Sequence, residues 1–168
     1  MGGMTVAGLD RASFQVPVDR LDRAVMRAVA AQGLPVAGWP IRWLLRLRGT
    51  DIPPRCLQGH DLVLPHGGAG IVVHYRTTIG SRVVIYQGVM IGRGDVWRPE
   101  TGDSGGVVVE DDAVLCAGAK VLYTSGILRV ARGSIVGANA VLTRSTSEGE
   151  IWAGVPARRI GVRTPSRR

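Results

Sequence analysis

An aspartate and a histidine of complementary chemistry, Asp51 and His66, stand fifteen positions apart, and Gly67 and Gly68 follow the histidine. A hydroxyl is a poor nucleophile at neutral pH, and an imidazole is the natural base to take its proton. A carboxylate on the other ring nitrogen fixes the tautomer and stabilises the imidazolium as it forms. The pair therefore predicts acid–base chemistry on a hydroxyl, with His66 as general base, Asp51 as its orienting partner and the glycines leaving room for an acceptor.

A six-residue repeat predicts the elements that must position this pair. Neither the helical period nor the two-residue strand period explains small aliphatic residues at intervals of six. Hexapeptide repeats are typical of a parallel β-helix, in which three repeats form one triangular coil and the repeated aliphatic points inward. The residues that fit are Val73, Ile79, Ile85, Ile91, Val109, Leu115, Val121, Val130, Val136 and Leu142.

Two breaks in this period predict loops that leave the coil. Ile91 and Val109 are eighteen residues apart, and the polar segment between them cannot supply three inward aliphatics. Val121 and Val130 are nine apart, which predicts a three-residue bulge. Loops on a rigid scaffold often carry function.

The first fifty residues have a different character. An amphipathic helix is predicted from Pro17 to Gln32, and a second from about Pro40 to Arg48. The second contains Trp39, Trp43, Leu44 and Leu47 among arginines. Such a segment suits a membrane surface, although packing against the rest of the protein with the arginines outward is the more common outcome and is expected here.

These patterns predict one mostly β domain at 50–163, after an N-terminal arm and helices at 1–49 and before a basic tail at 164–168. Coils are expected from about residue 52 to 145. With 45% hydrophobic and 20% charged residues, the chain has the composition of a folded protein.

The chain is strongly basic, with a formal net charge of +8. The arginines are mostly scattered, and no zinc-finger spacing, RNA-binding signature or long basic run is present, so no nucleic-acid partner is expected. A ligand with phosphates, such as coenzyme A, would use the same charges. Two lone cysteines, no secretory leader and no apolar run of about 20 residues predict a cytoplasmic protein without a membrane span.

Three stretches carry a resemblance to a known family. They are DIPPRCLQGHDLVLPHGGAGIVVH at 51–74, TTIGSRVVIYQGVMIG at 77–92 and AGVPARRI at 153–160. Together they resemble the catalytic domain of serine acetyltransferases and related polysaccharide O-acetyltransferases, over roughly Thr50 to Val162. The resemblance implies a left-handed β-helix, acetyl-CoA as acyl donor without a metal, direct attack by an acceptor hydroxyl, and a homotrimer with His66 in a cleft between subunits.

Candidate residues can be named for the two substrates. For the acceptor site the residues themselves suggest His74, as a second pocket residue or else a turn histidine, and Trp97 and Arg98, which the first loop offers in place of the family's usual residues. Small residues that let the pantetheine arm approach the backbone are Ala117, Gly118, Gly137 and Ala138. Cations for its phosphates are Lys120, Arg132, Arg158 and Arg159.

The sequence also departs from that family, which weakens serine as the acceptor. Pro65 stands where an aspartate usually precedes the histidine, and Gly105 and Gly106 fall where an Arg-His pair is usual. A sugar or surface-polysaccharide precursor is therefore an alternative acceptor.

Two alternatives come from other classes. A zinc enzyme resembling the gamma-class carbonic anhydrases would need three histidines, and the chain has His60, His66 and His74, at spacings that do not match that family. A non-catalytic β-helix scaffold would need neither Asp51 nor His66.

Overall fold

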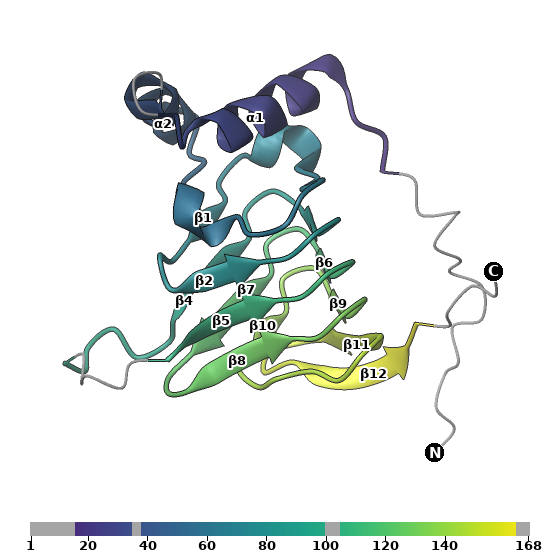
Figure 1. Ribbon diagram of the computed structural model, residues 1–168. Coiled ribbons are helices and arrows are strands. Elements are labelled where there is room, and N and C mark those ends of the chain that lie inside the picture. The colour runs from purple at the N-terminus through teal and green to yellow at the C-terminus, as the bar shows by residue number, and fades with distance from the viewer. Residues whose placement is uncertain (1–15, 35–37, 100–104, 164–168) are drawn as a thin grey trace.

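The computed structural model describes residues 16–34, 38–99 and 105–163, so most of the predicted arm and the whole basic tail lie outside the described residues. Two helices come first, followed by two short 3-10 helices and then only strands (Figure 1). The helices are α1 (Arg20–Ala31), α2 (Gly38–Leu47), η1 (Pro54–Cys56) and η2 (Pro65–Gly68).

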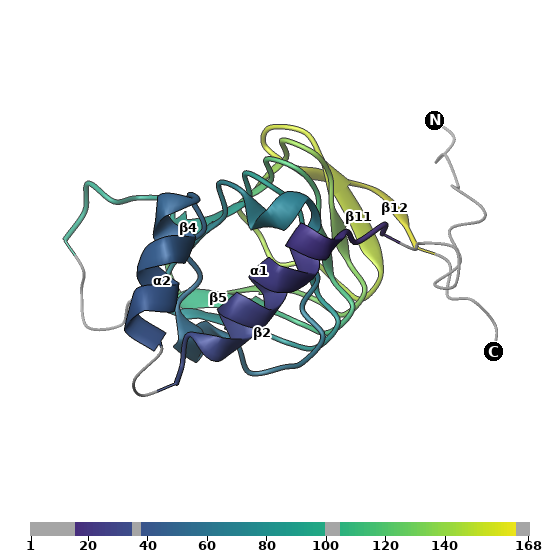
Figure 2. The same cartoon turned by 90° about the horizontal axis from the view of Figure 1, so that it is seen from above.

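The strands form three sheets that are the faces of a prism (Figures 1 and 2). Sheet I contains β1 (Val72–Val73), β4 (Met90–Arg93), β7 (Lys120–Tyr123) and β10 (Val141–Leu142). Sheet II contains β2 (Thr77–Ile79), β5 (Gly106–Val109) and β8 (Ile127–Val130). Sheet III contains β3 (Val84–Ile85), β6 (Val114–Leu115), β9 (Ile135–Val136), β11 (Glu150–Ala153) and β12 (Arg158–Val162).

The chain visits sheets I, II and III in turn, and each strand pairs in parallel with the strand one coil later. This winding is the predicted left-handed parallel β-helix. Asp51, Leu57 and Val63 form isolated parallel bridges to β1, β2 and β3. They make a first, irregular coil on the N-terminal side of these strands. Only β12 runs antiparallel, folding back on β11 at the far end, beyond the limit of residue 145 expected for the coils.

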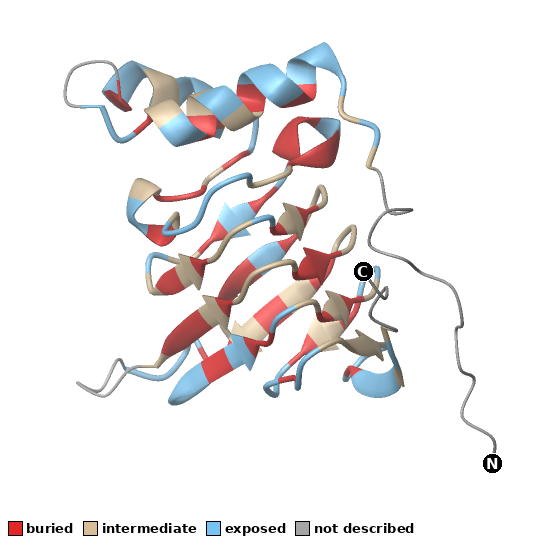
Figure 3. Ribbon diagram, turned by 45° about the vertical axis from the view of Figure 1, so that its right-hand side comes forward, coloured by how far each residue is buried: buried red, intermediate tan, exposed pale blue. Residues whose placement is uncertain are grey.

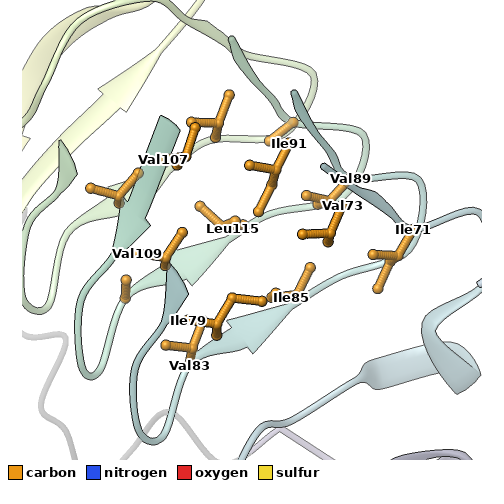
Figure 4. Close-up of a cluster of buried hydrophobic side chains, with 14 of the residues drawn as sticks. Ile71, Val73, Ile79, Val83, Ile85, Val89, Ile91, Val107, Val109 and Leu115 are labelled. Carbon is orange, nitrogen blue, oxygen red and sulfur yellow. The ribbon is translucent and has the colours of Figure 1, made fainter. Parts of the chain in front are cut away.

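The repeated aliphatics fill the prism as predicted. Val73 is in register with Ile91, Ile91 with Val121, and Val121 with Leu142, so the same position stacks through every coil. All ten predicted core residues are buried; Figure 3 shows buried positions recurring through the strands of the prism, and Figure 4 shows part of the core, including Ile79, Ile85 and Leu115. A solenoid of this kind is stabilised by burial between neighbouring coils.

A second inward position escaped the repeat analysis. Strand side chains alternate, so the residue two places before each aliphatic also points inward. Val83, Val89, Ala113 and Ala119 occupy this position and are fully buried.

Both predicted interruptions are confirmed. The chain leaves the prism after β4 of sheet I and re-enters it at β5 of sheet II, and Figure 1 shows residues 94–99 projecting from the prism. The shorter one lies at 124–126, between β7 and β8.

The two helices lie across the N-terminal end of the prism (Figure 2). Asp19 caps α1 in a capping box with Asp22, and Val25 and Val29 bury its inner face. On α2, Leu45 is buried, whereas Trp39, Trp43, Leu44 and Leu47 are exposed. The segment therefore packs against the protein as expected, but through Leu45 and Ile41 and not through these four side chains.

Candidate active site

The turns between sheets form three edges of the prism, and each histidine lies on a different one. His60 precedes Val63 on the edge between sheets II and III, His66 lies between Val63 and Val72 on the III–I edge, and His74 follows β1 on the I–II edge. Within the described residues, no group of three or more His, Cys, Asp or Glu side chains is placed to hold a metal ion. The three histidines of one chain therefore do not converge on a single site.

The turn that carries His66 has an unusual backbone. His66 and Gly67 adopt left-handed conformations with φ of 56° and 63°, and Gly68 continues at 62°. A left-handed conformation is uncommon for a residue with a side chain and persists where its surroundings hold it. The imidazole is exposed at the tip of this turn.

Two hydrogen bonds from other segments hold the turn. The Gly67 N–H donates to Asp22 Oδ1 at 2.6 Å, and Thr50 Oγ1 donates to the Gly68 carbonyl at 2.9 Å. Asp22 is only 4% exposed and also accepts from the Asp19 N–H in the first turn of α1. In the sequence Asp22 is only an acid in the first turn of a predicted helix, and no local pattern shows its contact with Gly67, which joins residues 45 positions apart.

Asp51 lies at the start of the first coil, paired with Val72 of sheet I. Its carboxylate accepts a hydrogen bond from Arg46 Nη2 at 3.1 Å, and Arg42 Nη2 is 3.9 Å away. In the described residues the structure contains no hydrogen bond between Asp51 and His66. The catalytic pairing of these two residues stays a prediction, and α2 supplies the cations that now neutralise the carboxylate.

Local packing explains why glycines follow His66. A Cβ on Gly67 would lie 3.1 Å from Arg48 Nη2, and one on Gly68 would contact Leu64 and Ile71. Both glycines are buried. The room that they were expected to leave for an acceptor is thus taken up in this chain by Arg48, α1 and the core, and their role in acceptor binding also stays a prediction.

The small residues predicted for coenzyme binding share the III–I edge with the His66 turn. Ala117 and Gly118 follow β6, and Gly137 and Ala138 follow β9, on the turns one and two coils beyond Gly88. Gly118 has φ of +68°, and a Cβ there would collide with the Asn139 side chain, so the turn itself requires glycine.

Lys120 lies beside this edge at the start of β7. Its ammonium group donates to the carbonyls of Gly118 at 2.6 Å and Gly88 at 3.4 Å. It therefore ties two successive turns together and places one positive charge next to the small residues.

The predicted phosphate-binding arginines are dispersed. Arg132 lies on the II–III edge, 3.8 Å from Asp111, away from the small residues. Arg158 and Arg159 lie on β12, where Arg159 Nε is 3.1 Å from Glu150 Oε1. Backbone donation from Ser147, then the Trp152 side chain and Arg159, hold the pKa of Glu150 below its ordinary value. Lys120 therefore lies next to the small residues of the III–I edge, whereas Arg132 does not.

A shallow pocket of about 400 Å³ opens near the I–II edge, on the outer face of sheet I. It brings together two predicted acceptor residues, His74 and Arg98, with Arg93, Val96 and Met90 on its walls. Arg93 is fixed by Asp95 at 2.8 Å, whereas Trp97 points into solvent, 75% exposed. His74 Nδ1 accepts the Arg76 N–H at 3.3 Å and lies 3.4 Å from the Tyr123 hydroxyl, which places its proton on Nε2 in the neutral ring.

The two cysteines offer no activated nucleophile. Desolvation by burial raises the pKa of Cys56 and of Cys116 above the ordinary value, so both remain thiols at neutral pH. Cys116 lies immediately before Ala117 on the III–I edge. An acetyl group carried along this edge would therefore not transfer readily to a cysteine.

No family model matches the chain. Among curated proteins, it is 41% identical over 106 residues to a plasmid-encoded serine acetyltransferase of Synechococcus elongatus, covering 60% of this chain and 32% of that protein. It is 32% identical over 120 residues to the serine acetyltransferase of Mycobacterium tuberculosis, covering 71% and 49%. The chain spans about half or less of the length of these curated relatives.

Solved structures agree with this likeness. A serine acetyltransferase from Brucella abortus in complex with coenzyme A superposes with a TM-score of 0.66 at 26% identity, over 86% of this chain and 56% of that one. The Vibrio cholerae serine acetyltransferase, at a TM-score of 0.69 and 22% identity, shows the common fold alone. Motifs, coils and comparisons together show that this chain resembles the serine acetyltransferases in its hexapeptide-repeat coils.

Proposed function

We propose that the protein is an acetyl-CoA-dependent O-acetyltransferase that acetylates a hydroxyl of a small acceptor. The observation that carries this proposal is the III–I edge, where the exposed His66 turn and the small residues Ala117 and Ala138 lie along one line of the prism. Such an edge offers a base at one end and close access to the backbone for an extended thioester substrate. The sequence likeness to serine acetyltransferases supports the same reaction.

In the proposed reaction His66 is the general base. Neutral imidazole accepts the acceptor's hydroxyl proton as the oxygen attacks the thioester carbonyl carbon. The tetrahedral intermediate collapses when the carbon–sulfur bond breaks, and the imidazolium returns the proton to the departing thiolate. Asp51 would orient the ring and stabilise its charged form, which requires the carboxylate to exchange Arg46 for His66.

Acetyl-CoA fits the residues present on the III–I edge. Ala117 and Ala138 leave the turn backbone accessible, and Lys120 contributes one cation beside it. Arg158 and Arg159 at the last strands are further candidates for the phosphates, whereas Arg132, on another edge, would need a second subunit to reach the same ligand.

A sugar hydroxyl is the second candidate acceptor, and one feature of the first loop favours it. A side chain at Gly105 would collide with the Gly126 carbonyl, and one at Gly106 with the Arg76 carbonyl. The backbone packing at the start of β5 therefore excludes the Arg-His pair that serine acetyltransferases usually carry there. The acceptor pocket must use other groups, such as His74 and Arg98.

The assembly that we propose is a cytoplasmic homotrimer with parallel prisms around a threefold axis. Exposed apolar residues on the outer face of sheet I, Val72 and Met90, are available for contact with a neighbouring prism. A trimer would also place a second copy's loop near the His66 turn. Multi-angle light scattering that gives a monomer or a dimer at micromolar concentration would count against this assembly.

The proposal is tested by incubating purified protein with acetyl-CoA and a panel of serine, sugars and small alcohols, and by following release of free thiol. Cys56 and Cys116 should add little background, since both are protonated and at least partly buried. We expect acceptor-dependent thiol release with at least one class, and the class identifies the acceptor. Absence of acceptor-dependent release together with no measurable binding of CoA by calorimetry would refute the proposed function.

A further inference from the structure

Helix α2 is apolar on two opposite sides, although it covers the protein with only one. Leu45 faces the core and is buried, and Ile41 packs against the same cluster. On the other side, Trp39 is 79% exposed, Trp43 59% and Leu47 64%. A helix that is apolar all round is normally buried on all sides.

The exposed apolar side chains form one continuous row. Trp39, Trp43 and Leu47 follow one another at intervals of four, which places them on the same helix face, and Leu44, also 59% exposed, widens the row. Scattered single apolar residues on a surface need no explanation, but a row of large aromatic and aliphatic residues marks an interaction surface. We call Trp39, Trp43, Leu44 and Leu47 the α2 row.

The charge around the α2 row is positive. Helix α2 contains no acidic residue, and the exposed Arg46 and Arg48 lie at its end. On the neighbouring α1, the exposed cations are Arg20, Arg23 and Arg27. Among the acids on or beside these helices, Asp22 is buried, Asp19 caps the start of α1, and Asp51 offsets the charge of Arg46, so the exposed arginines are in excess.

This charge selects among possible occupants. A second copy of the same face would bring arginines against arginines, which disfavours self-association. A bilayer with anionic headgroups offers negative charge to the arginines and an apolar boundary to the row. Tryptophan suits that boundary because its ring is apolar and its indole N–H bonds to the headgroup layer.

We propose that α2 docks this end of the protein on a membrane surface that carries anionic lipid headgroups. Neither helix in the described part of the chain is long and apolar enough to cross a bilayer, so the helix would lie in the interface plane. Both helices lie at one end of the prism (Figure 1), and the coils proceed away from them. Docking would therefore leave the later turns of the III–I edge, with Ala117 and Ala138, directed away from the bilayer.

The test is co-sedimentation of the full chain with phosphatidylcholine vesicles, with or without phosphatidylglycerol. We expect binding only to the phosphatidylglycerol vesicles, and its loss at high salt, where surface charges are screened. The double variant Trp39→Ser/Trp43→Ser should partition about tenfold more weakly or worse. Trp97→Ser is the matched control, because Trp97 is equally exposed but lies on the first loop, and it should bind like the unmodified protein.

Thermal melting of each variant shows whether it is folded, and exposed substitutions of this kind should leave the melting temperature nearly unchanged. Three results would overturn the proposal: no binding to either vesicle, equal binding to both, or unchanged binding by the folded double variant. Light scattering tests whether the α2 row instead binds a second copy of the chain. Self-association that the double variant abolishes, with no vesicle binding, would assign the α2 row to a second copy of the chain instead.

Discussion

The III–I and I–II edges are built from the same repeat, yet they differ in almost every property. On the III–I edge the turns are short, and Gly70, Gly88 and Gly118 stack with nearly the same backbone in successive coils. On the I–II edge the chain leaves the prism twice, and aromatic and cationic side chains gather around His74.

In our proposal the two edges serve the two substrates of one reaction. An uninterrupted edge gives an extended ligand the same close approach at every coil, which suits a long donor molecule. An interrupted edge varies freely without disturbing the stacked core, which suits selection of an acceptor. The exposed His66 turn stands at the start of the regular edge, and the pocket with Arg98 lies across sheet I from it.

The largest expected effect separates the two edges by their histidines. His66→Ala should lower turnover by roughly two to four orders of magnitude, because it removes the base, whereas acetyl-CoA affinity should stay nearly intact. His74→Ala should cost far less, since His74 is assigned to the acceptor pocket.

The competing metal mechanism makes a different forecast for the same variants. His60, His66 and His74 would then matter about equally, and a chelator would abolish activity. Near-normal turnover by a folded His66→Ala protein would remove His66 from the mechanism.

The second effect concerns the partner of Asp51. Asp51→Asn should lower turnover by roughly one to two orders of magnitude, less than His66→Ala, because a base remains in place. The control is Arg46→Gln, which removes the partner seen at 3.1 Å. If Asp51 must turn to His66, Arg46→Gln should leave turnover the same or raise it slightly, as initial rates will show. An equal loss in both variants would mean that the ion pair itself is needed.

The third effect tests whether α1 stabilises the His66 turn through Asp22. Asp22→Ala leaves the Gly67 N–H without its acceptor and should lower the free energy of unfolding by about 1–3 kcal/mol. Asp22→Asn keeps one oxygen acceptor and should lose less. Urea unfolding measures the free energy of unfolding of both variants. If Asp22→Ala loses no more of it than Asp19→Asn, which changes the exposed cap of α1, then the turn does not depend on Asp22.

The smallest effect belongs to the acceptor pocket. Arg98→Ala should raise the KM for the acceptor about threefold to tenfold with little change in the KM for acetyl-CoA, because Arg98 lines only that pocket. Arg82→Ala is the control, since Arg82 lies on the edge between sheets II and III, where it pairs with Asp111 and Asp112. A change confined to the KM for acetyl-CoA would reassign this loop to the donor.

The fold could be predicted from the sequence because each coil repeats the same local requirement. Each short strand of a coil needs one buried aliphatic, six positions after the previous one. Each of the ten residues, such as Ile85 and Leu115, is therefore separate evidence for the same fold. The interruptions after Ile91 and Val121 were visible for the same reason, as departures from a fixed interval.

The site could be predicted only in part, because its contacts join distant segments. Asp22 accepts a hydrogen bond from Gly67, and Asp51 pairs with Arg46. Both contacts depend on how α1 and α2 lie across the first coil, and no sequence period predicts that placement. Arg132 was predicted for the coenzyme site, but the structure places it elsewhere. Its charge suited a phosphate, but counting turns from β8 places it on the edge opposite sheet I, beside Asp111.

The central claim is that the III–I edge binds the coenzyme, and calorimetric titration of CoA tests it most directly. Ala138→Trp puts a large ring on an exposed position of that edge, and Thr143→Trp puts the same ring on an exposed position of the I–II edge, one strand later. Our account predicts that Ala138→Trp weakens CoA binding by about tenfold or more, whereas Thr143→Trp binds like the unmodified protein. Unchanged binding by a folded Ala138→Trp protein, or a loss confined to Thr143→Trp, would contradict it.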